Sequence, residues 1–332
     1  MRGFLTPTIN NRVQILSSMR LCKCLPNLFL TVLFYWIPSI SFAIGQDAVI
    51  LQSAELTESS GLAVSQHDPT LIWTHNDSGA KPRLYLFDRS HGKLRGLFQF
   101  KDVNATDWED MCVFQVNGRR FLAVGDVGDN HRRRKQVIIH VIEEPLPPPA
   151  SLFQTEDITE TSSSKGTSKL VLPVSPYLTI KVNYPEGAVD CESMIFDSEN
   201  SRFVLLTKEL FRSRVFSVAV EEKHFLKIST NPGPKEILCQ AEYVQTLGIP
   251  LATAADFCPD SHRLAVCTYG PAYMLEADGL RWNERTMKRI KLPKRKQGEA
   301  IAFADSDTLL LTSEFSPTPL WTVPIALNSK EK

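Results

Sequence analysis

The sequence predicts an all-β chain built from repeated units, and three observations support this prediction. Its apolar runs are short, rich in β-branched and aromatic residues, and bounded by Gly, Pro, Asp, Asn or Ser, as in "LIWTH", "RLYLF", "RFVLL" and "TLLLT". No segment keeps the i, i+3, i+4 apolar spacing of a long amphipathic helix. The composition, 43% hydrophobic and 22% charged over 332 residues, does not bear on the fold class and indicates only a globular chain with a large core.

The third observation is a unit that recurs five times. Each unit begins with an acid in front of a small apolar strand, followed by a turn and a second apolar strand, and the marker acids are Glu58, Glu109, Glu192, Asp256 and Glu299. A third strand usually follows, and a fourth can be recognised in "LRGLFQF", "LTIKV", "EILCQAEYV" and "MKRIKL". Repeated groups of four antiparallel strands predict the blades of a β-propeller, here a single domain over residues 44–330.

We predict five blades, with six as the alternative. The marker acids are separated by 51, 83, 64 and 43 residues. The longest gap holds a Pro-rich and Ser/Thr-rich stretch at about 146–169, which we interpret as an inserted, exposed loop. A sixth blade within 137–185 is the other interpretation of that gap. The last unit lacks a fourth strand, and "AVILQSAEL" before the first unit is predicted to pair into it and close the ring.

The N-terminal 43 residues have the pattern of a secretory signal peptide. Four basic residues and no acid precede an apolar run that ends in Ser41-Phe42-Ala43. We expect cleavage after Ala43, translation from Met1 or Met19, and a secreted or periplasmic protein without a membrane span. A membrane anchor is the alternative, which Pro38 and the short apolar core disfavour. The five later cysteines show no C-x-x-C spacing, so neither a zinc site nor a disulfide framework is predicted.

The repeat should bring many oxygen donors to one mouth of the central channel. In a propeller the first strand of each blade lines the channel and the second runs antiparallel beside it, so the start of one and the end of the other share a mouth. Strand starts carry Glu58, Asp107, Glu109, Asp190, Glu192, Asp256 and Glu299. Strand ends carry Asn76, Asp77, Asp126, Asp129, Asn130, Glu209 and Glu314.

Such a cluster predicts a bound Ca²⁺ ion. Carboxylates at close range repel each other, and a hard cation with roughly six to eight oxygen ligands in flexible geometry would relieve the repulsion. The stretch "GDVGDN" (125–130) combines glycines that permit a tight backbone with three oxygen donors. The predicted ligands are Glu58, Asp77, Asp126, Asp129, Asn130, Glu209, Asp256 and Glu299. The alternatives for individual acids are Asx turns, solvated bends, and hydrogen bonds from one blade to the backbone amides of the next.

Six further side chains are candidates for catalysis and substrate binding. Glu109 and Glu192 could orient a water molecule, while Trp108, His75, Arg132 and Lys208 could contact a substrate. His75 could equally be structural, Trp108 could pack between blades, and the basic stretch 131–135 could simply be solvated. No serine-hydrolase, zinc-protease or phosphate-loop motif is present. With zero net charge, nucleic acid is not an expected partner, and we expect a monomer that binds a small anion or a glycan.

Several of these stretches resemble a group of secreted bacterial β-propeller proteins of uncharacterised function. They are "ESSGLAV…WTHNDSG", "DWEDM…VGDVGDN", "YPEGAVDCESM", "TAADFCPD" and "GEAIAF…LTSE", within about residues 55–320. More distantly, "WEDM" and "CESM" are similar to the acid-plus-strand repeats of calcium-dependent apyrase-type nucleotidases, and phytase-like and gluconolactonase-like propellers share the general plan. The resemblance carries little function with it; the cluster of acids and the basic stretch 131–135 lead us to expect a metal-dependent hydrolase of small phosphorylated substrates. The alternative is a non-catalytic propeller that recognises a glycan or protein and holds only a structural metal.

Overall fold

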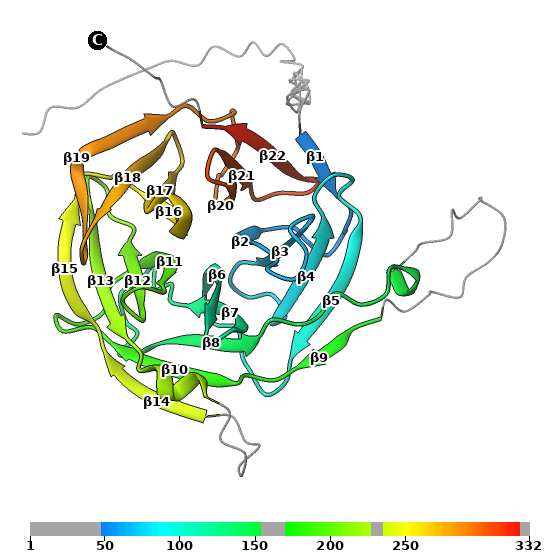
Figure 1. Ribbon diagram of the computed structural model, residues 1–332, viewed down its shortest axis with the longest axis horizontal. Helices are drawn as coiled ribbons and strands as arrows, with labels where there is room; N and C mark the ends of the chain where they lie inside the picture. The colour runs from blue at the N-terminus through cyan, green and yellow to red at the C-terminus, as the bar shows by residue number, and fades with distance from the viewer. Residues whose placement is uncertain (1–47, 154–169, 227–234, 326–332) are drawn as a thin grey trace, which may run out of the picture. The chain divides into compact units, whose positions relative to one another are not determined.

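Five β-sheets surround one centre in the propeller, whose computed structural model describes residues 48–153, 170–226 and 235–325 (Figure 1). The inner strands contact one another in the cyclic order β2, β6, β11, β16 and β20, so the ring is closed. Five blades of four antiparallel strands are confirmed, and six are excluded. The predicted signal peptide and most of the predicted inserted loop lie outside the described residues.

The first three blades follow the chain in order. Blade 1 contains β2 (Ser59–Val64), β3 (Leu71–Asn76), β4 (Arg83–Asp88) and β5 (Leu94–Phe100). Blade 2 contains β6 (Trp108–Val116), β7 (Arg119–Asp126), β8 (Val137–Glu143) and β10 (Leu178–Asn183). Blade 3 contains β11 (Cys191–Asp197), β12 (Arg202–Thr207), β13 (Ser213–Ala219) and β15 (Glu242–Leu247).

The last two blades complete the ring, and the N-terminal strand closes it. Blade 4 contains β16 (Ala252–Cys258), β17 (Arg263–Thr268), β18 (Ala272–Asp278) and β19 (Arg281–Ile290). Blade 5 contains β20 (Ala300–Asp305), β21 (Thr308–Thr312), β22 (Thr318–Pro324) and β1 (Ala48–Leu51). Strand β1 pairs antiparallel with β22, which confirms the closure predicted for the "AVILQSAEL" segment.

Two extra strands widen blades 1 and 2. Strand β9 (Leu172–Val174) runs parallel to β5, and β14 (Lys235–Gln240) runs parallel to β10. Each comes from the chain between the third and fourth strands of the following blade, which crosses to the outer edge of the preceding one before returning. The stretch "EILCQAEYV", predicted as one strand, is therefore divided between β14 and β15 at the buried Ala241. The described residues also contain three short 3₁₀ turns: η1 (Ala150–Phe153), η2 (Glu222–Phe225) and η3 (Pro259–Ser261).

The core lies between neighbouring blades, because both faces of each sheet are covered. Strand β12, for example, is buried along its whole length, which explains why its sequence is nearly continuous in apolar residues. Between blades 2 and 3, Phe114 stacks on Phe196 with ring centroids 3.9 Å apart. Within the described residues, the five cysteines are free and no helix is both long and apolar enough to cross a membrane.

Candidate metal site

A β-bulge at the start of the inner strands turns acidic side chains out of the sheet. The pairing of β6 with β7 shifts register between Trp108 and Asp110, and that of β11 with β12 shifts between Cys191 and Ser193. Glu109 and Glu192 are thus the extra residues of their bulges, and a bulge changes the direction of a side chain without breaking the strand. At these bulges the two acids of neighbouring blades come close enough for the Glu109 and Glu192 side chains to interact.

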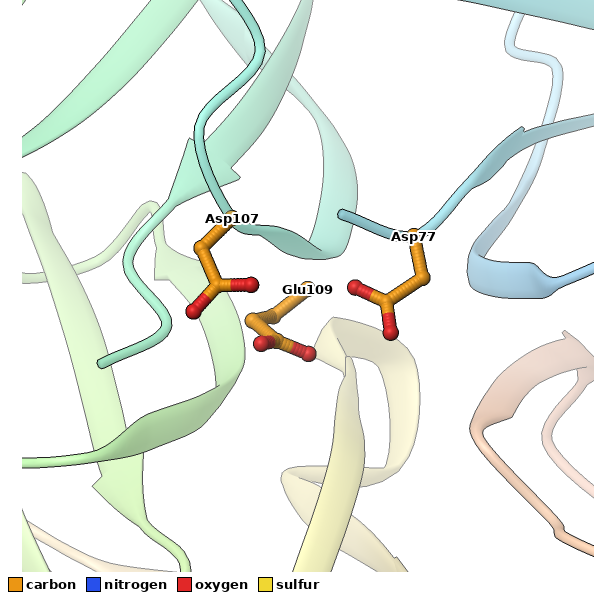
Figure 2. Close-up of side chains that lie close together, drawn as sticks. All are labelled: Asp77, Asp107 and Glu109. Carbon is orange, nitrogen blue, oxygen red and sulfur yellow. The ribbon is translucent and has the colours of Figure 1, made fainter. Parts of the chain in front are cut away.

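Three carboxylates converge at the junction of blades 1 and 2. Asp77 follows β3, Asp107 precedes β6, and Glu109 lies in the β6 bulge. One oxygen atom from each lies within 4.8 Å of the other two, and Figure 2 shows the three carboxylates around a common space. Glu109 is only 3% exposed. Within the part of the chain that the structure describes, none of the three forms an ion pair. We call these residues the acidic triad.

The electrostatics of the acidic triad favour the uptake of positive charge. Burial raises the pKa of Asp107 to about 6, and the negative charge of Asp77 adds to the shift. Burial also raises the pKa of Glu109 well above its usual value, with the charge of Glu192 as the next cause. The pKa of Asp77 is raised, again mainly by burial. Protons or a metal ion would both relieve this repulsion.

The backbone around the acidic triad fits a hard cation. The Gly128 amide donates to the Asp107 carbonyl (3.2 Å). A Cβ atom on Gly128 would lie 2.6 Å from Asp107 Oδ2 and still closer to Glu109 Oε1, so only glycine leaves room for the carboxylates. The donor set contains oxygen alone, which suits Ca²⁺ or Mg²⁺ rather than a soft transition metal. The residues present therefore fit a divalent metal, although they do not identify it.

Asp126 and Arg134 form an ion pair that holds the backbone of the segments next to the acidic triad. Asp126 accepts hydrogen bonds from the amides of Thr106 (3.0 Å) and Asp107 (3.1 Å). Arg134 Nη1 lies 2.7 Å from Asp126 Oδ1 and donates to the Gly128 carbonyl (2.8 Å). One guanidinium group thus holds the two segments that carry Asp107 and Gly128. Arg134 itself was not singled out in the sequence, because "HRRRK" gives no sign of which arginine turns inward.

The structure does not bring five of the predicted ligands to the acidic triad. Asp129 accepts from the Arg134 amide, and Asn130 beside it is exposed. Glu209 forms ion pairs with Arg214 (2.6 Å) and Arg212 (3.1 Å). Asp256 accepts from the amides of Phe257 (2.8 Å) and Phe303 (2.7 Å). Asp126, described above, likewise binds internal donors.

Lys208 lies at the mouth beside Glu192. Its Nζ lies 3.0 Å from Glu192 Oε1 and 5.3 Å from the centroid of the Tyr269 ring. Glu299 is close enough to be influenced by Lys208, yet burial outweighs that charge and raises the pKa of Glu299 to about 8. Burial also raises the pKa of Glu314 to about 7, with the charge of Asp77 next in importance. Among the described residues, the mouth therefore combines one inner ammonium group with several carboxyls.

Glu58 and Arg132 lie at the edge of this arrangement. Glu58 is exposed, forms a β-bridge with Glu314, and its carbonyl accepts from the Asp77 amide (2.9 Å). Glu58 and Asn76 also line a cleft of about 390 Å³ on the blade 1 side of the mouth. Arg132 is exposed and has a φ of 51°. Burial raises the pKa of Asp190, and the charges of Lys208 and Arg132 oppose this shift only in part.

His75 and Trp108 pack behind the acidic triad. Both are fully buried, and their rings meet edge to face with centroids 5.4 Å apart. The His75 imidazole fills the space beside Gly61, where a Cβ atom would collide with it. Burial lowers the pKa of His75 to about 4, so this ring is neutral at physiological pH. The structure therefore places both side chains in the packing between blades 1 and 2, alongside Phe100.

Asp110 is a buried carboxylate that the sequence analysis did not assign. It accepts from the amides of Met194 (2.9 Å) and Ala255 (3.0 Å), which belong to the inner strands of blades 3 and 4. Asp110 thus joins three blades near the axis. Its only signal in the sequence is its position in "DWEDM", next to the bulge residue Glu109.

No protein family and no curated protein sequence matches this chain. Solved structures resemble it at low sequence identity. A chain of a nidogen/laminin complex aligns with 83% of this chain over 80% of its own length, at 11% identity and a TM-score of 0.42. A 6-phosphogluconolactonase-like protein from Bacteroides uniformis aligns over 84% and 71%, at 13% identity and a TM-score of 0.39. The aldose sugar dehydrogenase of Streptomyces coelicolor with bound PQQ aligns over 83% and 98%, at 7% identity and a TM-score of 0.39.

Fold and site together define the class of this protein. It is a five-bladed β-propeller with a partly buried acidic cluster at one mouth of its channel. At these identities and TM-scores, neither a ligand nor an activity follows from the solved structures.

Proposed function

We propose that this protein is an exported, monomeric, Ca²⁺-dependent hydrolase that acts on a small phosphorylated substrate at the acidic channel mouth. The observation that carries the proposal is the acidic triad, in which Asp77, Asp107 and Glu109 lie within 4.8 Å of one another without an ion-pair partner among the described residues. Export rests on the N-terminal sequence pattern, and the choice of calcium rests on the oxygen donors and their irregular arrangement.

The acidic triad would hold the ion. When bound, a divalent cation supplies charge that polarises a phosphoryl oxygen. Glu192, paired with Lys208, is the base: it takes a proton from the attacking water as the new oxygen–phosphorus bond forms. The ester oxygen leaves as its bond to phosphorus breaks and receives that proton. Lys208 is placed to bind the phosphoryl group, and Arg132 at the edge adds positive charge for the anion.

A non-catalytic function is the second candidate, and one contact favours it. Lys208 already forms an ion pair with Glu192, so the candidate base is engaged in the absence of substrate. In this alternative the metal ties blades 1 and 2 together, and the mouth binds a glycan or a partner protein without turnover.

Thermal melting with calcium, combined with turnover assays on phosphate esters and anhydrides, tests both candidates. We expect calcium to raise the melting temperature of the wild-type protein and to support turnover. Glu109→Gln should reduce the calcium effect and abolish turnover, whereas Glu192→Gln should keep the calcium effect and lose turnover. The matched control is Glu276→Gln, which removes one exposed carboxylate on β18. A melting temperature that does not respond to calcium would refute the metal site, and calcium stabilisation without any turnover would favour the binding function.

A further inference from the structure

Exposed aromatic side chains are concentrated around the mouth that holds the acidic triad. Among the described residues, four aromatic side chains are strongly exposed: Phe211 (81%), Tyr243 (51%), Phe315 (47%) and Tyr269 (39%). Phe211, Tyr269 and Phe315 lie in the loops between the second and third strands of blades 3, 4 and 5. Those loops share a mouth with the starts of the inner strands. We call these three residues the aromatic rim.

Each residue of the aromatic rim is next to a charged residue of the mouth. Phe211 follows Lys208 in the same loop, and the Tyr269 ring lies 5.3 Å from Lys208 Nζ. Phe315 follows Glu314 directly, and its ring lies 5.0 Å from Lys296 Nζ. The mouth therefore presents both charged groups and exposed rings, an arrangement suited to a ligand that has a charged and an apolar part.

The backbone holds Phe315 outward at a conformational cost. Its φ is 76°, in the left-handed region that bulky residues disfavour. Its amide donates to the Thr57 carbonyl (2.7 Å) at the entrance to blade 1, which fixes the turn. One side of the ring contacts Lys296, and the half that stays exposed in this unfavourable conformation is free to contact a ligand.

The size of the aromatic rim favours a small molecule over a protein partner. At roughly 200 Å² for each aromatic side chain, the exposed parts of the three rings amount to on the order of 300 Å². A stable protein interface needs about 800 Å² from each partner. A single aromatic or alkyl group, in contrast, could be covered by one such ring.

We propose that the mouth selects small anions that carry an apolar group, with the anion bound by the metal-loaded triad and Lys208 and the apolar group on the aromatic rim. This inference deepens the proposed function and rests on it for the position of the anion. It narrows the substrate class to phosphate esters with an aromatic or alkyl substituent.

Binding of matched phosphonates tests this inference without hydrolysis. Isothermal titration of the calcium-loaded, full chain with methylphosphonate and phenylphosphonate should show about tenfold tighter binding of phenylphosphonate, as expected for a ring packed on one or two aromatic side chains. In the double variant Phe211→Ala/Phe315→Ala the ratio should fall to about twofold or less, with methylphosphonate affinity unchanged. Tyr243→Ala, at the fourth exposed aromatic residue, is the control and should leave the ratio unchanged.

Equal affinity for the two phosphonates, or a preference that survives the double variant, overturns the inference. Acetate and phenylacetate form a second pair that separates it from the proposed function. If neither phosphonate binds but phenylacetate binds more tightly than acetate through the aromatic rim, selection for an apolar group stands and phosphoester hydrolysis falls. If no compound of either pair binds, both proposals fail.

Discussion

At the scale of single residues, the site depends on the space that Gly128 leaves for the carboxylates of Asp107 and Glu109. A carboxylate oxygen needs a clear path to the ion, and any side chain at Gly128 would occupy it. The conformational freedom of this glycine is not the reason, since its φ lies in the ordinary range. What matters is close approach between backbone and ligands.

Gly128→Ala should therefore weaken calcium binding by at least about tenfold, because the new methyl group displaces Glu109 and Asp107. Titration calorimetry with calcium measures this change. Gly248→Ala is the matched control, since its nearest neighbour, Glu284 Oε1, is 3.5 Å from the added Cβ atom, an ordinary contact. Unchanged calcium affinity in Gly128→Ala would place the ion elsewhere.

The carboxyls of the mouth also predict how the metal-free protein responds to pH. The pKa values of Asp107 (about 6), Glu314 (about 7) and Glu299 (about 8) are raised on folding, mainly by burial. The folded state therefore binds more protons at these carboxyls than the unfolded state does. The stability that these three groups contribute is fully present at low pH and is lost as pH rises through their folded-state pKa values. We expect the metal-free melting temperature to fall between about pH 5 and pH 8.

Calcium should reverse this trend, because the ion binds the ionised carboxylates and competes with protons. Its apparent affinity should rise over the same pH interval, and melting curves with calcium or with a chelator at each pH measure both effects. A metal-free melting temperature that rises steadily from pH 5 to pH 8 would contradict the assignment of protonated carboxyls.

At the scale of elements, buried acids join the inner strands of neighbouring blades. Asp110 on β6 accepts from amides of β11 and β16, and Asp256 on β16 accepts from the Phe303 amide of β20. Adjacent inner strands belong to different sheets, so these side chains supply hydrogen bonds that the sheets do not. They stabilise the ring near its axis.

Asp256→Ala should lower the free energy of unfolding by about 3 kcal/mol, because two amides lose their acceptor. Asp256→Asn keeps one acceptor oxygen, so its free energy of unfolding should lie between those of Asp256→Ala and the wild type. Urea denaturation measures both, and Asp278→Ala, at an exposed position on β18, should change stability little. If Asp256→Ala is as stable as the control, the contact between blades 4 and 5 does not depend on this carboxylate.

At the scale of the whole molecule, stability depends on closure of the ring by β1. The four residues of this strand pair with β22, and Leu51 is buried among side chains of blades 5 and 1. Without β1, β22 becomes an exposed edge strand and Leu51 leaves a cavity.

A chain that begins at Gln52 should therefore be at least about 3 kcal/mol less stable than one that begins at Ala48. The two proteins differ only in β1, so the comparison isolates closure of the ring. Denaturant unfolding and size-exclusion chromatography at matched concentration measure stability and association. Equal stability of the two chains would show that blade 5 does not need its fourth strand.

Much of this architecture could be predicted from local patterns. Strand identity, blade number, closure by β1 and the gathering of acids at one mouth follow from the spacing of apolar runs and from Glu109, Glu192 and Glu299 at strand starts. The local pattern could not distinguish β9 and β14 from the ordinary strands of their own blades. The reason is that each pairs with a strand of the preceding blade, which lies far away in the sequence.

The sequence by itself determined a closed ring of small blades with an acidic mouth, because alternation and repetition are local properties of the chain. Only the tertiary structure decided which acids meet. Asp126 and Asp256 look like ligands in the sequence but accept hydrogen bonds from backbone amides, whereas Asp77, Asp107 and Glu109 converge around a space that Gly128 leaves free. The reason is that a carboxylate's partner depends on bulges, loop paths and contacts between blades, which join residues far apart along the chain.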